Sequence, residues 1–278
     1  MRFMHEIEEL KPGKTLVVCD YMMKLLLQKF REPQRDWYAK KGVSLHGSMF
    51  FYKRSESSDI EVEIHDVFSN GVCVQNWYFT ASAFEATIKN FTSKHDDITS
   101  LVIWPDNGPH YHNTSIILWL MRFPELCPIK LERYSFFEAQ KGKTSLDSHF
   151  ATFKFVLRGW MNKGNDILSS EDIVNGTKDH LKGTHVYEIH IDRSREPKSA
   201  NTWNGISMFG DFTFVYNNRQ CIAIDVREQT SKCDGKAKRF ERKKLFELWP
   251  NYLKSDTIST GVTSDSNDTD ESGVQPVS

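Results

Sequence analysis

Apolar runs and polar–apolar alternation divide the first part of the chain into strands. The run TLVVCDYMMKLLL begins with β-branched residues and predicts a strand after the turn at Lys11-Pro12-Gly13. SLHGSMFFYKR predicts a second strand. The alternation in DIEVEIHDVFSN predicts a third, closed by the turn at Asn70-Gly71. We expect the acids and the histidine of this third strand, Glu61, Glu63, His65 and Asp66, to form its exposed face and its end.

Apolar residues at spacings of three and four predict three helices over the next hundred residues. The first covers residues 77–94, the second is HNTSIILWLMRF, ended by Phe123-Pro124, and the third runs from Ser145 to Met161 and stops near Lys163-Gly164. The wholly apolar SLVIWPD and the segment PIKLERYSFFEA predict strands between them. This order predicts an α/β fold: a mixed sheet of three antiparallel strands and then parallel βαβα units, with helices on both faces.

The chain after residue 163 is smaller and strand-rich. SSEDIVNGTKDHLKG predicts a short helix opened by a serine cap, THVYEIHID a strand, and the segment around Asn217-Asn218 a hairpin. We therefore divide the chain into a polar lead (1–13), an α/β core (14–163), an α+β extension with a basic segment (164–250) and a tail (251–278). The tail is acidic and rich in Ser and Thr, and is predicted to be disordered.

The charge balance limits how this chain could meet nucleic acid. The 278 residues carry a formal net charge of −1, so any DNA-binding surface must be a local basic patch. Residues 232–244 contain such a run: Lys236, Lys238, Arg239, Arg242, Lys243 and Lys244. This run could contact the DNA backbone, act as a nuclear localisation signal or form a solvated helix face, and the three interpretations stay open.

The cysteines and the N-terminus bear on the compartment. Five scattered cysteines without a CxxC pair indicate reduced thiols and argue against a zinc knuckle. The first residues have no apolar segment typical of a signal peptide, and no apolar run reaches membrane-spanning length. We expect a nuclear or cytoplasmic protein that is not secreted.

Three aspartates stand where their carboxylates could converge. Asp20 lies inside the first strand, Asp106 ends an apolar strand, and Asp147 lies in the first turn of the third helix. Adjacent parallel strands would bring Asp20 and Asp106 together, and a helix packed on the sheet would add Asp147. An unpaired carboxylate inside an apolar strand is costly, which favours a functional role for Asp20. Carboxylates on rigid elements suit Mg²⁺, which can drive phosphodiester chemistry as a metal pair.

The segments around these aspartates resemble the three acidic motifs of DDE transposases and retroviral integrases. LVIWPDNGPHYHN resembles the second motif, an apolar strand followed by Asp-Asn-Gly and an aromatic residue. EAQKGKTSLDSHFATFKFVLR is similar to the third, with Gly142, Asp147, Phe150 and Lys154 at the motif positions. VVCDYMMK is similar to the first. The resemblance covers about residues 14–163.

This resemblance implies a ribonuclease-H-like catalytic core that cleaves and joins DNA strands. It implies Mg²⁺ or Mn²⁺ held by Asp20, Asp106 and Asp147 as the catalytic acids. DNA is the expected partner, self-association into a homo-oligomer stays open, and neither a membrane nor a small-molecule substrate is expected. The residues expected to contact DNA are Asn107, Lys141, Lys143, Lys154, Lys236, Arg239 and Lys243.

The chain departs from the family pattern at the third acid, which is Asp147 where the family usually has Glu. Glu138 is the rival third ligand. Two alternatives therefore stand beside the transposase or integrase reading. One is a domesticated, catalytically inactive derivative that binds DNA or protein, and the other is a ribonuclease-H-like nuclease acting on RNA–DNA hybrids. His110-Tyr111-His112 has two interpretations, a zinc or general-base site and a structural role, and we favour residues that line the rim of the cleft or cap the next helix.

Overall fold

A computed structural model describes residues 2–37, 40, 42–69, 74–137, 145–228, 236–253, 255 and 257–264. The strands are β1 (Lys14–Leu25), β2 (Val43–Tyr52), β3 (Glu61–Ser69), β4 (Ser100–Pro105), β5 (Lys130–Ser135), β6 (Thr184–His190), β7 (Phe209–Asn217), β8 (Gln220–Glu228), β9 (Lys238–Glu241) and β10 (Thr263–Ser264). The α-helices are α1 (Arg2–Glu8), α2 (Trp77–Lys94), α3 (Thr114–Leu126), α4 (Ser145–Asn162), α5 (Ser170–Thr177), α6 (Arg242–Leu245) and α7 (Pro250–Leu253). Short 3-10 helices cover Gln34–Trp37, Arg193–Arg195, Ile206–Met208 and Phe246–Leu248.

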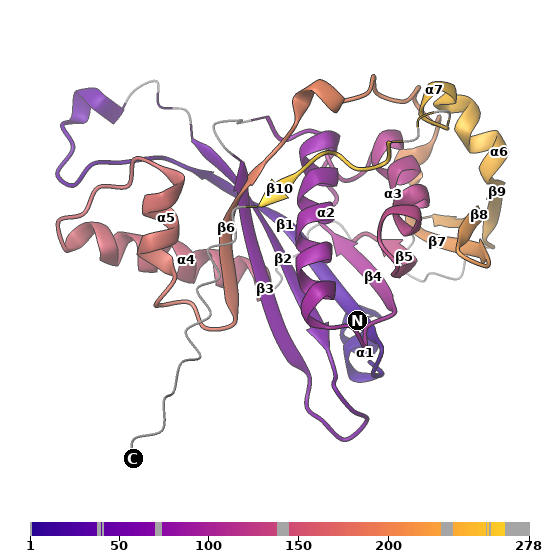
Figure 1. The fold of residues 1–278 in the computed structure, drawn as a ribbon, viewed down its shortest axis with the longest axis horizontal. Helices are drawn as coiled ribbons and strands as arrows, with labels where there is room; N and C mark the ends of the chain where they lie inside the picture. Colours follow the sequence, from indigo (N-terminus) through magenta and orange to yellow (C-terminus); the bar gives the residue numbers. More distant parts are fainter. Residues whose placement is uncertain are drawn as a thin grey trace, which may run out of the picture.

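All of these strands belong to one mixed sheet in the order β10-β6-β3-β2-β1-β4-β5-β7-β8-β9 (Figure 1). β3, β2 and β1 are antiparallel neighbours, whereas β1, β4 and β5 run parallel. The helices α2 and α3 make the crossovers into β4 and β5. The predicted mixed sheet, with antiparallel strands first and parallel strands next, is confirmed at the centre of the molecule.

The strands after residue 163 extend this sheet at both edges. β6 lies parallel to β3, while β7, β8 and β9 continue the sheet beyond β5. An open strand edge leaves unpaired backbone donors and acceptors, and these additions pair both edges of the central five strands. The boundary that we placed at 163/164 therefore does not separate two sheets, although the capped helix α5 and the β7–β8 hairpin were both predicted.

The two faces of the sheet are covered by different helices (Figure 1). Because side chains alternate along a strand, Val17 and Cys19 of β1 face a core built with α2 and α3. Leu16 and Val18 face the opposite core, to which α4 and α5 contribute. The predicted helices on both faces are confirmed, and each strand at the centre of the sheet is buried on both sides.

Helix boundaries follow local signals with one exception. α2 covers the predicted 77–94, with the Asn76 side chain accepting a hydrogen bond from the Phe79 N–H at 3.0 Å. α3 continues past Pro124 to Leu126, where we predicted its end at Phe123-Pro124. Pro124 lacks the N–H that would donate to the carbonyl four residues earlier, but it lies in the last turn, and the helix ends two residues later at Leu126.

Both ends of the described chain are more ordered than their polarity indicates. Residues 2–8, predicted as a polar lead, form α1, and the Phe3 ring packs edge-on against Phe51, Trp104 and Phe137. At the other end, the segment from α7 to β10 crosses α2 and α3 (Figure 1). The predicted disorder of 251–278 is thus wrong for the described residues 257–264. Residues 265–278 lie outside the described residues.

Two further features bear on the compartment. Within the described ranges, no helix is both long and apolar enough to cross a membrane. Cys19, Cys127 and Cys221 are buried free thiols. The nuclear or cytoplasmic location stays a prediction.

Candidate functional site

Asp20 and Asp106 lie side by side at the junction of β1 and β4. The parallel register pairs Cys19 with Pro105, and the Asp106 N–H continues the ladder by donating to the Cys19 carbonyl at 3.0 Å. Asp20 and Asp106 each follow one residue of this Cys19–Pro105 pair, so they lie opposite each other on neighbouring chain segments about 4.8 Å apart. The sequence-based expectation that parallel strands bring these two acids together is confirmed.

A glycine on β2 lets α4 approach this junction. Gly47 is the register partner of Asp20 on β2, and a Cβ there would lie 2.8 Å from ring carbons of Phe150 and 3.1 Å from Leu146 Cδ1. Both contacts come from the first turns of α4, so the helix rests directly on the glycine backbone. Asp147 follows Leu146 in the chain and is exposed at this end of the helix.

The pKa of Asp20 is affected by both of the other aspartates. Burial raises the pKa of Asp20 to about 7, and the carboxylates of Asp106 and then Asp147 raise it as well. The Tyr21 N–H donates to Asp20 Oδ1 at 2.7 Å and acts in the opposite direction. The three carboxylates do not all lie within 4.8 Å of one another, so the cluster is open.

A buried Asp–His pair fixes α4 beside the cluster. Asp66 on β3 is the register partner of Gly47, which places Asp20, Gly47 and Asp66 in one row across the sheet. The Asp66 carboxylate is fully buried and its Oδ2 lies 2.6 Å from Nε2 of His149 on α4. Burial raises the pKa of Asp66, and the bond to His149 opposes that shift. Sequence reasoning placed Asp66 on an exposed strand end, which is wrong because α4 covers this face.

Two histidines, His110 and His112, contact residues of the turn that follows Asp106. The ring of His110 lies over Gly108, where a Cβ would come within 2.7 Å of the ring, so only glycine fits without displacement. His110 is close enough to Asp106 for that carboxylate to raise its pKa against a larger lowering by burial. His112 Nδ1 bonds the Asn107 side-chain oxygen at 2.7 Å. Neither histidine caps α3, because Asn113 does so by accepting a hydrogen bond from the Ile116 N–H at 3.0 Å, and their place at the rim of a cleft stays a prediction.

Besides Asn107, the predicted DNA contacts that the structure describes fall into two groups. Lys154 stands two helical turns after Asp147 and therefore on the same side of α4, about 10 Å along its axis. Lys236, Arg239 and Lys243 lie on or beside β9, five strands from β1 and thus about 24 Å away. Arg239 is also paired with Asp225 at 2.7 and 2.8 Å. The structure does not bring this basic segment to the aspartates.

Three further residues of the predicted site, Lys141, Lys143 and Glu138, lie outside the described residues.

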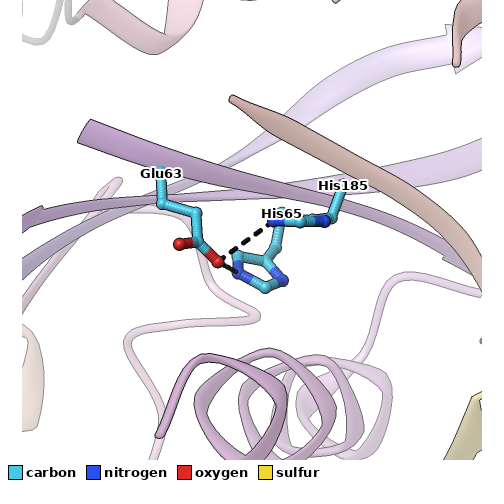
Figure 2. A group of neighbouring side chains, drawn as sticks. All are labelled: Glu63, His65 and His185. Atoms are coloured by element: carbon cyan, nitrogen blue, oxygen red, sulfur yellow. Dashed lines mark hydrogen bonds and ion pairs between the residues drawn. The ribbon is translucent and has the colours of Figure 1, made fainter. Parts of the chain in front are cut away.

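A second cluster of ionisable side chains was missed from the sequence. Glu63, His65 and His185 meet on the α2 side of the sheet, each with a potential metal-binding atom within 4.8 Å of the others (Figure 2). His65 is fully buried, and the Glu63 side chain is 12% exposed. The prediction that they lie on an exposed face is wrong because β6 pairs with β3 and α2 covers them. The spacing Glu-x-His on one strand was the available signal.

The charge state of this second cluster follows from its contacts. Burial alone would raise the pKa of Glu63, but hydrogen bonds from His185, His65 and His95 together bring it well below its usual range. Burial lowers the pKa of His65 to about 4, against the opposing effect of its bond to Glu63. The cluster therefore holds an ionised carboxylate among imidazoles, of which the buried His65 is neutral at neutral pH.

Comparison with known proteins identifies a family without assigning an activity. No curated protein and no solved structure was found to match this chain. The family model described as a domain of unknown function (DUF8701) matches residues 2–204, from α1 through β6 to the segment after it. Because that match spans well over half of the 278 residues, the chain belongs to the DUF8701 family.

Proposed function

We propose that this protein is a ribonuclease-H-like polynucleotidyl transferase of the DDE transposase and integrase kind. Asp20, Asp106 and Asp147 would hold Mg²⁺ or Mn²⁺, and the substrate would be DNA. The observation that carries the proposal is the parallel pairing that sets Asp106 beside Asp20, with the first turn of α4 packed on Gly47, the partner of Asp20 on β2. The carboxylates of Asp106 and Asp147 both raise the pKa of Asp20, which agrees with this arrangement. The acids come from β1, the end of β4 and the first turn of α4, as the three motifs require.

The donor set fits a hard divalent cation. All three side chains offer carboxylate oxygens, which Mg²⁺ and Mn²⁺ prefer. The charges that shift the pKa of Asp20 are both negative, so an added cation would relieve their repulsion. When bound, such ions activate the attacking oxygen and stabilise the leaving oxygen of a phosphodiester. Lys154 on the same side of α4 would contact a phosphate of the bound strand.

One observation favours a second candidate, the catalytically inactive DNA-binding derivative. The carboxylates do not all lie within 4.8 Å of one another, and the shorter Asp147 replaces the usual Glu. A cluster that no longer closes around its metals would retain the fold and lose strand cleavage. The sheet also carries five strands beyond the central five, which gives such a derivative more surface for other contacts.

Metal-dependent nicking of supercoiled plasmid tests the proposal. The wild-type protein should nick the plasmid with Mg²⁺ or Mn²⁺ and not with EDTA. Asp106→Asn should lower the rate by about 100-fold or more, because it removes a carboxylate ligand of the reacting site. Asp179→Asn changes an exposed aspartate on the chain after α5 and should leave the rate unchanged.

The outcomes separate the candidates. Equal rates for wild type and Asp106→Asn would overturn the catalytic role. Mn²⁺ binding by wild type that is lost in Asp106→Asn, without nicking by either, would identify the inactive derivative. Faster cleavage of an RNA–DNA hybrid than of duplex DNA would identify a ribonuclease-H-like nuclease instead.

A further inference from the structure

Strand register builds the second cluster. Glu63 and His65 are alternate residues of β3, so their side chains project from the same face of the sheet. β6 runs parallel to β3 with His185 as the register partner of His65, which sets the two imidazoles side by side with ring centres 4.9 Å apart. Residues 120 positions apart in the sequence thus form one group, on the face opposite to Asp20.

The spacing of the three side chains approaches that of ligands around one metal ion. Glu63 Oε1 lies 2.8 Å from His65 Nε2 and 3.2 Å from His185 Nε2. Bonds of 2.0–2.1 Å in a tetrahedral zinc site imply ligand–ligand distances of about 3.3–3.4 Å. A shift of a few tenths of an ångström along each of these contacts would admit an ion.

Neighbouring side chains orient the three ligands. His95, which caps the C-terminal end of α2, has its Nε2 2.9 Å from Glu63 Oε2, so Oε1 is the oxygen that faces the other two imidazoles. Tyr187 Oη lies 3.2 Å from His65 Nδ1. A hydroxyl can donate or accept, so Tyr187 can accept from Nδ1–H when Nε2 is bound to a metal. Metal-bound histidines are usually held in this way through their second nitrogen.

Burial is graded across the group. His65 has no exposed surface, Glu63 is 12% exposed and His185 is 35% exposed. His185 therefore opens the group to solvent and gives an ion a route of entry. Two imidazoles, one carboxylate and a fourth position facing outward are the donor set of zinc sites with three protein ligands.

We propose that Glu63, His65 and His185 form a binding site for a zinc-class divalent metal ion, with His95 as a positioning residue for Glu63. Imidazole nitrogens favour Zn²⁺ and Co²⁺ over Mg²⁺, so this site and the aspartate cluster would select different ions. The metal would join β3 to β6, and so would fasten the later strands to the central sheet. This site is independent of the proposed activity on DNA.

Zinc binding by the full chain tests the proposal. After EDTA treatment and its removal, isothermal titration should give one equivalent of bound Zn²⁺ that 5–10 mM Mg²⁺, on the order of a hundredfold excess, does not displace. Co²⁺ should give a visible absorption band of a four- or five-coordinate site. Zn²⁺ should also raise the melting temperature of the protein, because the metal binds only the folded arrangement of β3 and β6.

Variants at the half-exposed ligand separate binding from folding. His185→Asn should weaken Zn²⁺ binding by about 100-fold or more, while its melting temperature in EDTA stays close to that of wild type. His95→Asn should weaken binding by about 10–100-fold and keep one equivalent, as expected for a residue that orients a ligand. His180→Asn changes an exposed histidine five residues away and should bind as wild type does.

Three results would overturn the site. They are no zinc binding by wild type, wild-type affinity in both His185→Asn and Glu63→Gln, or loss of the bound zinc in Asp106→Asn. The last result would place the ion at the aspartate cluster instead. A wild-type protein that binds zinc but does not nick plasmid would count against the proposed function alone.

Discussion

At the residue scale, Asp20 carries a stability cost that its position imposes. The carboxylate lies within the central strand β1, near two other carboxylates, and its pKa of about 7 means that the ionised form is disfavoured in the folded state. In the unfolded chain an aspartate ionises at about pH 4. A group kept at such a cost is typical of a functional site, where strain or repulsion is relieved by a ligand.

This cost predicts how Asp20→Asn changes stability with pH. Below about pH 4 Asp20 is protonated in both states, so it adds no pH dependence. Between about pH 4 and 7, Asp20 is ionised in the unfolded state but still protonated in the folded state, so the free energy of unfolding of the wild type falls as pH rises. Above about pH 7 Asp20 is ionised in both states, and the free energy of unfolding falls no further on its account. Asp20→Asn should therefore be more stable than wild type at pH 8 by about 1–3 kcal/mol, after allowance for partial exposure, and nearly equal at pH 4.

Urea denaturation in EDTA at both pH values checks this prediction. Asp179→Asn, at an exposed position, should follow wild type at each pH. A stabilisation by Asp20→Asn of the same size at pH 4 and pH 8 would show that ionisation is not its cause.

Some of the acidic residues near the candidate site could be predicted from the sequence, and others could not. Asp106 was predicted from a motif that is contiguous in the chain, and its place beside Asp20 follows from parallel pairing. Asp66 and His149 form their 2.6 Å contact across 83 residues, and no local pattern indicates such a pair. The sequence therefore predicted the aspartates and not the pair that fixes α4 beside them.

At the element scale, the position of α4 depends on a glycine in β2, Gly47, which has no side chain to keep the helix away from the sheet. Gly47 lies under Phe150 and Leu146, and this contact fixes how closely the first turn of α4 approaches β1 and β2. The elements themselves were predictable, since the periodicity of residues 77–94 and 145–161 reproduces α2 and α4 nearly to the residue. Their contacts with the sheet depend on side-chain volumes that periodicity does not encode.

Gly47→Ala and Gly159→Ala should therefore have opposite effects. The added methyl at residue 47 would lie 2.8 Å from the Phe150 ring, and overpacking of this kind costs about 1–3 kcal/mol. Gly159, on α4 itself, has nothing within 4 Å of the new methyl, and alanine should stabilise the helix by about 0.5–1 kcal/mol. Urea denaturation measures both. A gain in stability at residue 47 would contradict the close approach of α4.

At the scale of the whole molecule, non-local strand pairing produced what the sequence did not predict. The parallel pairing of β6 with β3 makes β3 an interior strand, which buries His65 and brings His185 to it. A strand's parallel partner can come from a distant part of the chain. Here β3 ends at residue 69 and β6 begins at residue 184, which is 115 residues later. Among the central five strands, β1–β2 and β2–β3 are neighbours in both the chain and the sheet, and one helical crossover joins β4 to β5; only β1 pairs with a strand, β4, that is distant in the chain.

Polar contacts hold the segment from α7 to β10 against α2. The sequence predicted disorder here because the segment has few apolar residues, and that composition does not reveal polar contacts of this kind. Glu85 on α2 is 1% exposed and accepts hydrogen bonds from Ser259 Oγ at 2.6 Å, Thr260 N–H at 2.8 Å and Thr260 Oγ1 at 3.0 Å. Its only ion-pair partner among the described residues is Lys89, at 2.8 Å. A buried carboxylate needs such donors, and the serine and threonine supply them.

The double variant Ser259→Ala, Thr260→Val removes two of these donors and should lower the free energy of unfolding by about 2–3 kcal/mol, since it leaves each oxygen of the buried Glu85 carboxylate with one donor, the Lys89 ammonium or the Thr260 N–H. The same double change in a Glu85→Gln background should cost clearly less, because the charge that the hydroxyls solvate is gone. Thr257→Val, at an exposed threonine of the same segment, should cost less than about 0.5 kcal/mol. Urea denaturation of the four combinations measures the coupling free energy between Glu85 and the two hydroxyls. Additive effects would mean that apolar packing, and not the buried carboxylate, holds this segment against α2.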